Sequence, residues 1–349
     1  MSAAVRIRSL AQPVAALLVA FAIAAVLIAT TSGEPFPKSL SVVAESFTAL
    51  FRGAFGDVNG LLRSLAKATP LLFSGLAVAV ALRAGLFNIG AEGQLLVGGL
   101  AAAWAGYAIK GLPLIIHLPL AMLAGAAAGA LWAAVPGVLK AWRGAHEVIV
   151  TIMMNYVAIY LTHYLVNGPL RDPATRQTAT PTVLPTAQLW SLPGSATNFS
   201  AGFFLALLAA AAVAFLLRRT ALGFEIRAVG LGPDAARAAG ISVPRTIVTT
   251  MCLSGALAGL AGAVEVLAVH HRYLDQFSPG YGFDSIAVAL LGGLNAPGVT
   301  LAALLFGGLK SGANEMYTQT QTPIMIVGVI QAVVILAIGI RRLRGRREG

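Results

Sequence analysis

Residues 202–217 read GFFLALLAAAAVAFLL and contain no charged side chain. Residues 316–340 are equally free of charge. A helix of about 20 apolar residues crosses a hydrocarbon core of roughly 30 Å. Runs of this kind therefore indicate helices that span a membrane.

The composition of the whole chain agrees with these runs. Of its 349 residues, 58% are hydrophobic and 11% are charged, whereas soluble domains carry about 25% charged residues. The mean hydropathy is +0.82. This composition excludes a cytosolic enzyme, a secreted domain and a disordered protein. The apolar residues form unbroken blocks instead of alternating, which excludes an outer-membrane barrel. The predicted fold class is an all-α, polytopic membrane protein.

The apolar blocks predict about ten spans. The eighth and ninth come from one block, residues 286–309, which Asn295 to Gly298 interrupts. Proline ends one helix and can begin the next, so Pro297 predicts two shorter helices that meet at a turn. The ten predicted spans are residues 13–31, 66–83, 89–109, 114–139, 146–166, 199–217, 246–268, 283–295, 297–315 and 322–340.

Basic residues set the predicted orientation. Lysine and arginine outnumber aspartate and glutamate by 24 to 13, a net charge of +11, and basic loops stay in the cytoplasm. With ten spans, the N-terminal arginines, the loop 218–245 and the C-terminal tail all lie on that face. We therefore expect an even number of spans and two cytoplasmic termini, with loops 32–65 and 167–198 outside. The charge indicates a membrane protein's inner face and no nucleic-acid partner.

The N-terminus resembles a signal peptide only superficially. Arg6 and Arg8 precede an apolar stretch, residues 13–30, that is longer than the apolar region of a typical signal peptide. We interpret this stretch as an uncleaved first span. Spans two to five and seven to ten run in opposite senses, and residues 72–77 echo residues 253–258, as an inverted repeat would require.

Several patterns associated with enzymes are incomplete. Residues 230–235 match G-x-G-x-x-A, but no strand precedes them. Residues 308–311 lack the glycine that precedes the lysine of a phosphate-binding loop. The histidines have no metal-ligand spacing, and the single cysteine, Cys252, cannot form an internal disulfide. We therefore expect no ATP site, no catalytic group, no metal and no cofactor in this chain.

The loop between the sixth and seventh spans contains a predicted helix outside the membrane. Pro233 suits the first helical position and Asp234 the first turn, Ala235 to Ala239 favour a helix, and Gly240 suits the residue after its end. The apolar Ile241 follows. Such a helix can simply connect two spans, or it can be a rigid projection that docks into a partner, which is the interpretation we favour.

Three stretches resemble a known class. Residues 230–241 look like the coupling-helix loop of ABC importer permeases of the branched-chain amino acid, ribose and galactose class, and residues 253–262 and 282–294 are typical of the same class. The resemblance runs from about residue 65 to the C-terminus. It implies a cytoplasmic ABC ATPase, a second permease subunit and an extracytoplasmic substrate-binding lipoprotein as partners. The residues that it implies contact the ATPase are Pro233, Asp234, Ala235, Ala236, Arg237, Gly240 and Ile241.

Two further stretches narrow the resemblance. Residues 86–94 and 147–156 look like permeases of nucleoside importers that work with a basic-membrane-protein-type lipoprotein. Gln94 is typical of the longer of their two paired permeases. The resemblance implies one permease domain in the cell membrane. Its parts are residues 1–65 (first span and outer loop), 66–217 (first helix set), 218–245 (coupling loop) and 246–349 (second helix set and basic tail).

Polar residues at the ends of the spans are candidates for either the transport pathway or helix locking. Asn88 suits a cap of the third span and Glu92 its first turns. Glu147 begins the fifth span, and Asn155 lies deeper and needs a buried partner. The candidates for these two roles are Asn88, Glu92, Gln94, Glu147, Asn155 and Asp284. Outside the membrane, loop 167–198 is either a solvated connector or a landing surface for the binding protein, through Arg171 and Arg176. Glu265 is expected at the outer interface.

Three alternative functions follow from the same residues. A sugar permease of the same class would differ mainly in the stretch 86–94. A proton-coupled transporter needs titratable groups deep in the membrane, and the predicted positions of the acids near span ends argue against it. An intramembrane enzyme lacks a catalytic constellation in the sequence.

Overall fold

A computed structural model describes residues 3–192 and 197–345. These residues form helices and no extended sheet, with only two isolated β-bridges between single residues. The all-α prediction is therefore confirmed. The last two arginines of the basic tail, Arg346 and Arg347, lie outside the described residues. The helices are α1 (Ala3–Thr31), α2 (Lys38–Phe55), α3 (Val58–Arg83), α4 (Ala91–Ala108), α5 (Leu114–Arg143), α6 (Glu147–Asn167), α7 (Gly202–Arg219), α8 (Ala221–Leu231), α9 (Pro233–Ala238), α10 (Val243–Val264), α11 (Tyr281–Leu291), α12 (Ala296–Thr320) and α13 (Met325–Gly345), with a 3₁₀ turn η1 (Pro185–Ala187) and a π-helix η2 (Glu265–His270).

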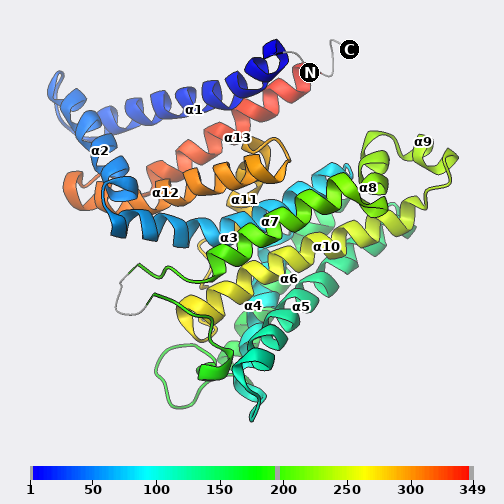
Figure 1. Cartoon of the computed structure of the whole chain (residues 1–349). Coiled ribbons are helices and arrows are strands. Elements are labelled where there is room, and N and C mark those ends of the chain that lie inside the picture. Colours follow the sequence, from blue (N-terminus) through cyan, green and yellow to red (C-terminus); the bar gives the residue numbers. More distant parts are fainter. Residues whose placement is uncertain (1–2, 193–196, 346–349) are drawn as a thin grey trace. The chain divides into compact units, whose positions relative to one another are not determined.

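The chain divides into two compact units, residues 1–68 with 304–349 and residues 69–303. In the first unit, α1 packs against α13 and α2. The α1 and α13 helices run in opposite directions, so α1 begins and α13 ends at the same end of this unit (Figure 1). Phe21 of α1 contacts Phe47 and Phe51 of α2, with ring centroids 5.5 and 5.8 Å apart. Two spans that lead to termini on one side of a membrane must run antiparallel in this way.

The second unit is built around α10, which packs on α5 and α4. Glycines allow these backbones to touch. A Cβ added at Gly259 would overlap the carbonyl oxygen of Gly125, and one at Gly255 would overlap that of Gly129. Close approach through small residues is how helices associate in lipid, where there is no hydrophobic force between them. The buried face of α5 is correspondingly narrow and recurs every third or fourth residue, at His117, Ala121, Gly125, Gly129, Ala133, Pro136 and Gly137.

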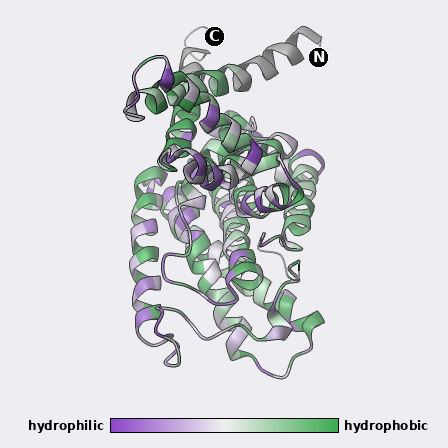
Figure 2. Ribbon diagram, turned by 90° about the vertical axis from the view of Figure 1, so that its left-hand side faces the viewer, coloured by the Kyte–Doolittle hydropathy of each residue, from purple (hydrophilic) through white to green (hydrophobic). Residues whose placement is uncertain are grey.

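The outer faces of this unit are strongly apolar. Ile115 and Leu131 of α5 are 79% and 72% exposed, and Phe215 of α7 is 63% exposed. Soluble monomers rarely expose apolar surface on this scale. Green, hydrophobic stretches follow the long helices in Figure 2. Among the described residues, five helices are long and apolar enough to cross a membrane, namely α3, α5, α6, α7 and α10 with its π-helical end. A polytopic membrane protein is thus confirmed, while the number of spans stays a prediction.

Two segments differ from the predicted boundaries. Residues 32–65 contain helix α2, and α3 begins at Val58 instead of residue 66. The α2 helix is amphipathic and carries Lys38, Glu45 and Arg52, so an apolar run does not mark it. The predicted turn before Pro297 is present, where the Asn295 Oδ1 accepts the Gly298 N–H at 3.0 Å. The helix that follows, however, is α12, with 25 residues, and is not short.

Candidate functional site

A buried cluster of polar side chains joins α3, α4 and α10. The side-chain amides of Asn88 and Gln94 exchange two hydrogen bonds, at 3.0 and 3.1 Å. Asn88 Nδ2 also donates to Ser254 Oγ on α10 at 2.8 Å, and Ser254 Oγ donates to the carbonyl of Ala77 on α3 at 2.7 Å. All three polar side chains are buried. Because buried polar groups are costly when unpaired, this chain of bonds fixes the three helices in one register.

Asn155 extends the cluster to α6. Its Nδ2 donates to the Ile89 carbonyl at 2.9 Å, and its Oδ1 accepts the Gly93 N–H at 2.8 Å. Asn155 is 2% exposed. Both bonds go to the backbone at the start of α4, where the first N–H groups of a helix have no partner within the helix. The deep amide therefore has the buried partner that it requires.

Glu92 joins the start of α4 to the start of α11. One oxygen of its carboxylate accepts the Gly282 N–H at 2.6 Å, and its side chain is buried. A carboxylate at a helix N-terminus also suits the helix dipole.

The residues of this cluster are Asn88, Glu92, Gln94, Asn155 and Ser254, and we call them the polar core. It ties five helices together at one level of the second unit.

Two of the predicted caps, Asn88 and Glu147, differ in detail. The N-cap residue of α4 is Gly90, and Asn88 accepts the Gly90 N–H at 3.0 Å from outside the helix. The backbone turns there before α4 begins, so Asn88 cannot reach the second or third helical N–H. The N-cap of α6 is His146, while Glu147 forms an ion pair with Lys140 of α5 at 2.9 Å. Asp284, by contrast, lies half-buried in the first turn of α11, as expected of an acid at a helix N-terminus.

Glu265 was expected at the outer interface and is instead buried. It begins the π-helix η2, is 6% exposed, and lies 3.7 Å from His270 Nε2. Backbone N–H groups of Val183 and Leu189 donate to the carbonyls of His271 and Leu267, so this part of loop 168–192 packs against η2. Glu92 and Glu265 are therefore both buried acids, so the predicted positions of the acids no longer separate a pump from a proton-coupled transporter.

One face of α6 carries three tyrosines that are not among the residues predicted from the sequence. Tyr156, Tyr160 and Tyr164 are spaced by four residues, so they share a face, and they are 54%, 69% and 67% exposed. Tyrosines normally sit at the membrane–water interface because the hydroxyl needs a polar partner. Because the row reaches the middle of the helix, this face is a candidate for contact with a polar pathway or another protein. The spacing inside the predicted span 146–166 is the sequence signal.

The loop between α7 and α10 consists of two short helices. Thr220 Oγ1 accepts the Gly223 N–H at 3.1 Å and caps α8, which was not predicted. The predicted helix outside the membrane is present as α9, with Pro233 in its first turn. Gly240 has a φ of +83°, as expected of a glycine that ends a helix.

Most of α9 faces outward. Asp234 and Arg237 form an exposed ion pair at 2.9 Å, and Ala236 is the buried residue of the helix. Ile241 donates its N–H to the Ala236 carbonyl and closes the turn. Just before α9, the side chain of Leu231 is 91% exposed. A large apolar residue held out on a capped helical element is a candidate protein contact.

At the opposite ends of the helices, the loop after α6 (residues 168–192 and 197–201) is folded onto the bundle. Its backbone donates to carbonyls far away in the sequence, from Leu184 to Gly106 at 2.9 Å and from Leu189 to Leu267 at 3.0 Å. Backbone hydrogen bonds to distant segments do not occur in a solvated connector. Arg171 and Arg176 are both exposed on this loop. On the predicted topology this loop lies outside the membrane, and we call residues 168–192 and 197–201 the outer platform.

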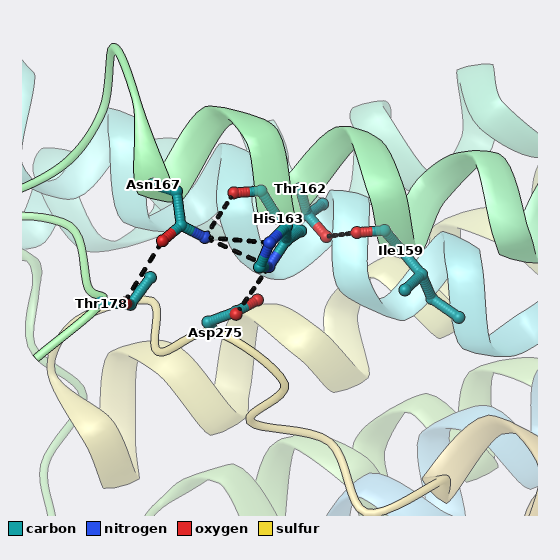
Figure 3. A network of polar contacts seen from close by, with 6 residues as sticks. All are labelled: Ile159, Thr162, His163, Asn167, Thr178 and Asp275. Atoms are coloured by element: carbon teal, nitrogen blue, oxygen red, sulfur yellow. Dashed lines mark hydrogen bonds and ion pairs between the residues drawn. The ribbon is translucent and has the colours of Figure 1, made fainter.

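Polar contacts fasten the end of α6 to the outer platform and to the segment after η2 (Figure 3). His163 Nδ1 lies 2.8 Å from Asp275 Oδ2, and Asn167 Nδ2 donates to the His163 carbonyl at 2.9 Å. Thr178 Oγ1 of the platform donates to Asn167 Oδ1 at 3.4 Å. The C-terminal end of α6 is therefore held to the outer platform through Asn167 and to the segment after η2 through His163.

Comparison with known proteins identifies the family. Residues 60–339 match the model of the branched-chain amino acid transport system permease component. The chain belongs to this permease family. No solved structure matches the chain.

Three relatives of this permease are named for a substrate. It is 45% identical over 336 residues to the guanosine ABC transporter permease protein NupP of Bacillus subtilis, covering 95% of this chain and 93% of the relative. It is 37% identical to the nucleoside ABC transporter permease protein NupB of Lactococcus lactis, over 84% and 82% of the two chains. It is also 37% identical to the glucose ABC transporter permease protein TsgB13 of Haloferax volcanii, over 93% and 85%.

These findings fix the coarse function. The chain is the permease component of an ABC importer, a transport subunit that crosses the plasma membrane several times. The proton-coupled transporter and the intramembrane enzyme thereby lose their support.

Proposed function

We propose that this permease imports nucleosides. The support comes from two relatives with guanosine or nucleoside in their names, at 45% and 37% identity, and from the resemblance of residues 86–94 and 147–156 to nucleoside permeases. The proposal includes three partners: a cytoplasmic ABC ATPase, a second, paralogous permease and an extracytoplasmic binding lipoprotein.

The tyrosine face of α6 is the observation that supports a nucleoside pathway. An aromatic ring can stack on a nucleobase, which is worth about 1–3 kcal/mol per base in nucleic-acid complexes. The tyrosine hydroxyl adds a hydrogen-bonding group for the sugar. Tyr156, Tyr160 and Tyr164 offer both along one line, and they begin below the outer platform. The second permease closes this face into a pathway.

The polar core holds the pathway in place and does not itself bind substrate in this proposal. Asn155 and Tyr156 are neighbours on α6, yet Asn155 points into the bundle and Tyr156 away from it. The two backbone hydrogen bonds of Asn155 fix the rotation of α6 about its axis, and so fix where the tyrosines face.

The loop between α7 and α10 is the proposed contact with the ATPase. Leu231 and the exposed side of α9, with Asp234 and Arg237, form its surface. ATP-driven closure of the ATPase pushes on α9, and the pathway changes from open outside to open inside. The binding lipoprotein delivers the nucleoside to the outer platform, where Arg171 and Arg176 are exposed.

Uptake assays test the proposal. Labelled guanosine, uridine, adenosine, ribose and glucose are presented to cells with and without the gene, with poisons that separate ATP from the proton gradient. We expect gene-dependent nucleoside uptake that needs ATP and survives collapse of the gradient. Uptake that vanishes with the gradient while ATP persists would overturn the pumping mechanism.

A substitution on α6 tests whether the tyrosine face contacts the substrate. Tyr160→Ala should lower nucleoside uptake by about tenfold or more, the loss of one stacking interaction. Phe215→Ala on α7 is the matched control, because it removes a similarly exposed aromatic ring from another helix. Equal losses in both variants would show that exposed rings act through lipid packing and not through substrate.

A sugar importer is the second candidate. The glucose ABC transporter permease protein TsgB13 matches 93% of this chain at 37% identity. A relative of similar sequence is therefore named for a sugar. Uptake of glucose or ribose without nucleosides would move the chain to this branch while leaving the ABC mechanism intact.

A further inference from the structure

A cavity of about 270 Å³ lies where α3 and α7 end, beside α8 and the turn between α11 and α12. Three arginines line it, Arg83 of α3, Arg218 of α7 and Arg227 of α8. We call it the arginine pocket. The polar core, the tyrosine face and the α9 surface do not include any of these arginines, so the mechanism proposed above leaves the pocket unused.

The positive charge in the pocket has no acid among the residues that line it. Within the described part of the chain, the side chains of Arg218 and Arg227 make no ion pair or hydrogen bond to another residue. Glu225 lies near in sequence, but its carboxylate accepts the Thr246 hydroxyl at 3.4 Å. Two residues apart on a helix, Glu225 and Arg227 point in different directions. The Arg218 and Arg227 cations in the lining of one cavity repel one another unless an anion joins them.

The pocket is also anchored. Arg83 Nε donates to the carbonyl of Leu294 at 2.8 Å, which holds its side chain against the turn before α12. Ala296, the first residue of α12, lines the same cavity. The positive end of that helix dipole adds to the field of the arginines. The cavity therefore offers an anion a fixed positive charge, from Arg83, and a fixed backbone turn beside it.

Apolar side chains complete the lining and favour a lipid phosphate over a protein carboxylate. Ala214 and Leu217 of α7 form an apolar wall beside the charges. In the predicted topology, the ends of α3 and α7 lie at the cytoplasmic membrane surface, where anionic headgroups gather and attract arginines. We propose that the arginine pocket binds the phosphate of an anionic phospholipid.

A phosphate in this pocket would connect α3 to α7 and α8, which lie far from α3 in the sequence. Arg83 belongs to α3, which the polar core fixes, whereas Arg218 and Arg227 belong to α7 and α8. A shared anion draws α8 toward the bundle, and α8 leads directly into α9. On the proposed coupling role of α9, lipid binding then stabilises the position from which the ATPase pushes.

Lipid-dependent stability of the purified full chain tests this inference. Its thermal midpoint is measured in detergent with added phosphatidylglycerol, phosphatidylcholine or inorganic phosphate, and retained lipid is counted by native mass spectrometry. We expect phosphatidylglycerol to raise the midpoint and phosphatidylcholine not to. In the double variant Arg218→Gln, Arg227→Gln, apparent affinity for phosphatidylglycerol should fall by about thirtyfold.

Arg219→Gln is the matched control, since Arg219 is the exposed neighbour of Arg218 but does not line the pocket. It should keep the response to phosphatidylglycerol. The double variant to lysine keeps both charges but loses the planar guanidinium groups, and should fall between wild type and the glutamine variant. This series separates binding from misfolding.

Three results would overturn the inference. Equal loss in Arg219→Gln would mean that general surface charge attracts the lipid. A full effect of inorganic phosphate with no further effect of phosphatidylglycerol would assign the pocket to a free phosphate. If the double glutamine variant no longer co-purifies with the ATPase subunit, and phosphatidylglycerol does not raise the thermal midpoint of the wild-type chain, the arginines would be assigned to an acidic protein partner.

Discussion

The carboxylate of Glu92 accepts the backbone N–H of Gly282 at 2.6 Å, across 190 residues of sequence. The bond joins the first turn of α4 to the first turn of α11. There is no room for a side chain at Gly282, because a Cβ there would overlap the backbone of Glu92. A short helix that begins inside the bundle thus obtains its N-terminal partner from a different helix.

Replacing Glu92 separates the hydrogen bond from the charge. Glu92→Gln keeps an acceptor oxygen, so we expect ATP-dependent uptake close to that of wild type, with no effect of ionophores. Glu92→Leu leaves the Gly282 N–H buried without this acceptor and should cost about 1–3 kcal/mol of stability. Thermal unfolding and uptake are measured for both. A folded Glu92→Gln protein without uptake would instead assign the charge a direct role in transport.

Removing the Asn155 side chain should loosen α6. Asn155→Leu leaves the Ile89 carbonyl and the Gly93 N–H buried without their partner, at a cost of about 1–3 kcal/mol for each unsatisfied group. We expect a lower thermal midpoint and lower uptake together. Met153→Ala, a truncation at an exposed position of the same helix, should leave the midpoint nearly unchanged. A stable but inactive Asn155→Leu protein would mean that the amide faces the substrate.

The contact between α5 and α10 should not tolerate a methyl group. Gly259→Ala places a Cβ on the Gly125 carbonyl oxygen, and such overpacking typically costs about 1–3 kcal/mol. Gly328→Ala in α13 meets nothing within 4 Å, and alanine favours a helix by up to about 1 kcal/mol over glycine. Thermal midpoints should move in opposite directions, and a harmless Gly259→Ala would contradict the close backbone contact.

Leu231 should matter for assembly and not for folding. Its side chain is 91% exposed, so Leu231→Asp removes little packing within the chain. We expect an unchanged thermal midpoint of the isolated permease and reduced co-purification of the ATPase. Trp190→Asp makes a similar change on the outer platform, where Trp190 is 54% exposed, and should leave ATPase binding intact. Loss of the ATPase in both variants would point to misfolding.

The predicted orientation can be read with thiol reagents. Cys252 is the single cysteine, so Cys252→Ala provides a background for Ala174→Cys and Ala238→Cys, both at exposed positions. With an even number of spans and cytoplasmic termini, an impermeant maleimide should label residue 174 in intact cells and residue 238 only after lysis. The reverse pattern would invert the topology and remove the basis for placing the ATPase at α9.

Local signals were enough to predict several elements from the sequence. The predicted spans 114–139, 146–166 and 199–217 coincide closely with α5, α6 and α7. Each is a long apolar run with polar or helix-ending residues at its borders. The α9 helix was predicted from the proline that begins it and the glycine that follows it. These features depend on residues only a few positions apart, so a single sequence contains them.

The rest depends on contacts between distant residues. Asn88 and Ser254 are 166 positions apart, and nothing in either local sequence specifies their pairing. The outer platform has no periodicity because its backbone bonds go to other segments. The α2 helix is amphipathic, and a search for apolar runs misses it. The tyrosines of α6 were present in the sequence, but their significance follows from their exposure, which only the packing of α6 establishes.

The connection between α7 and α10 is stiff. Its breaks, at Thr220, Gly232 and residues 239–242, are short, and each is closed by backbone or side-chain hydrogen bonds. A chain of stiff segments with closed joints has low compliance, so a load applied to α9 is transmitted as displacement and not absorbed as bending. The stroke of a nucleotide-driven partner would then reach the ends of both α7 and α10, and α10 is the helix on which α4 and α5 are packed.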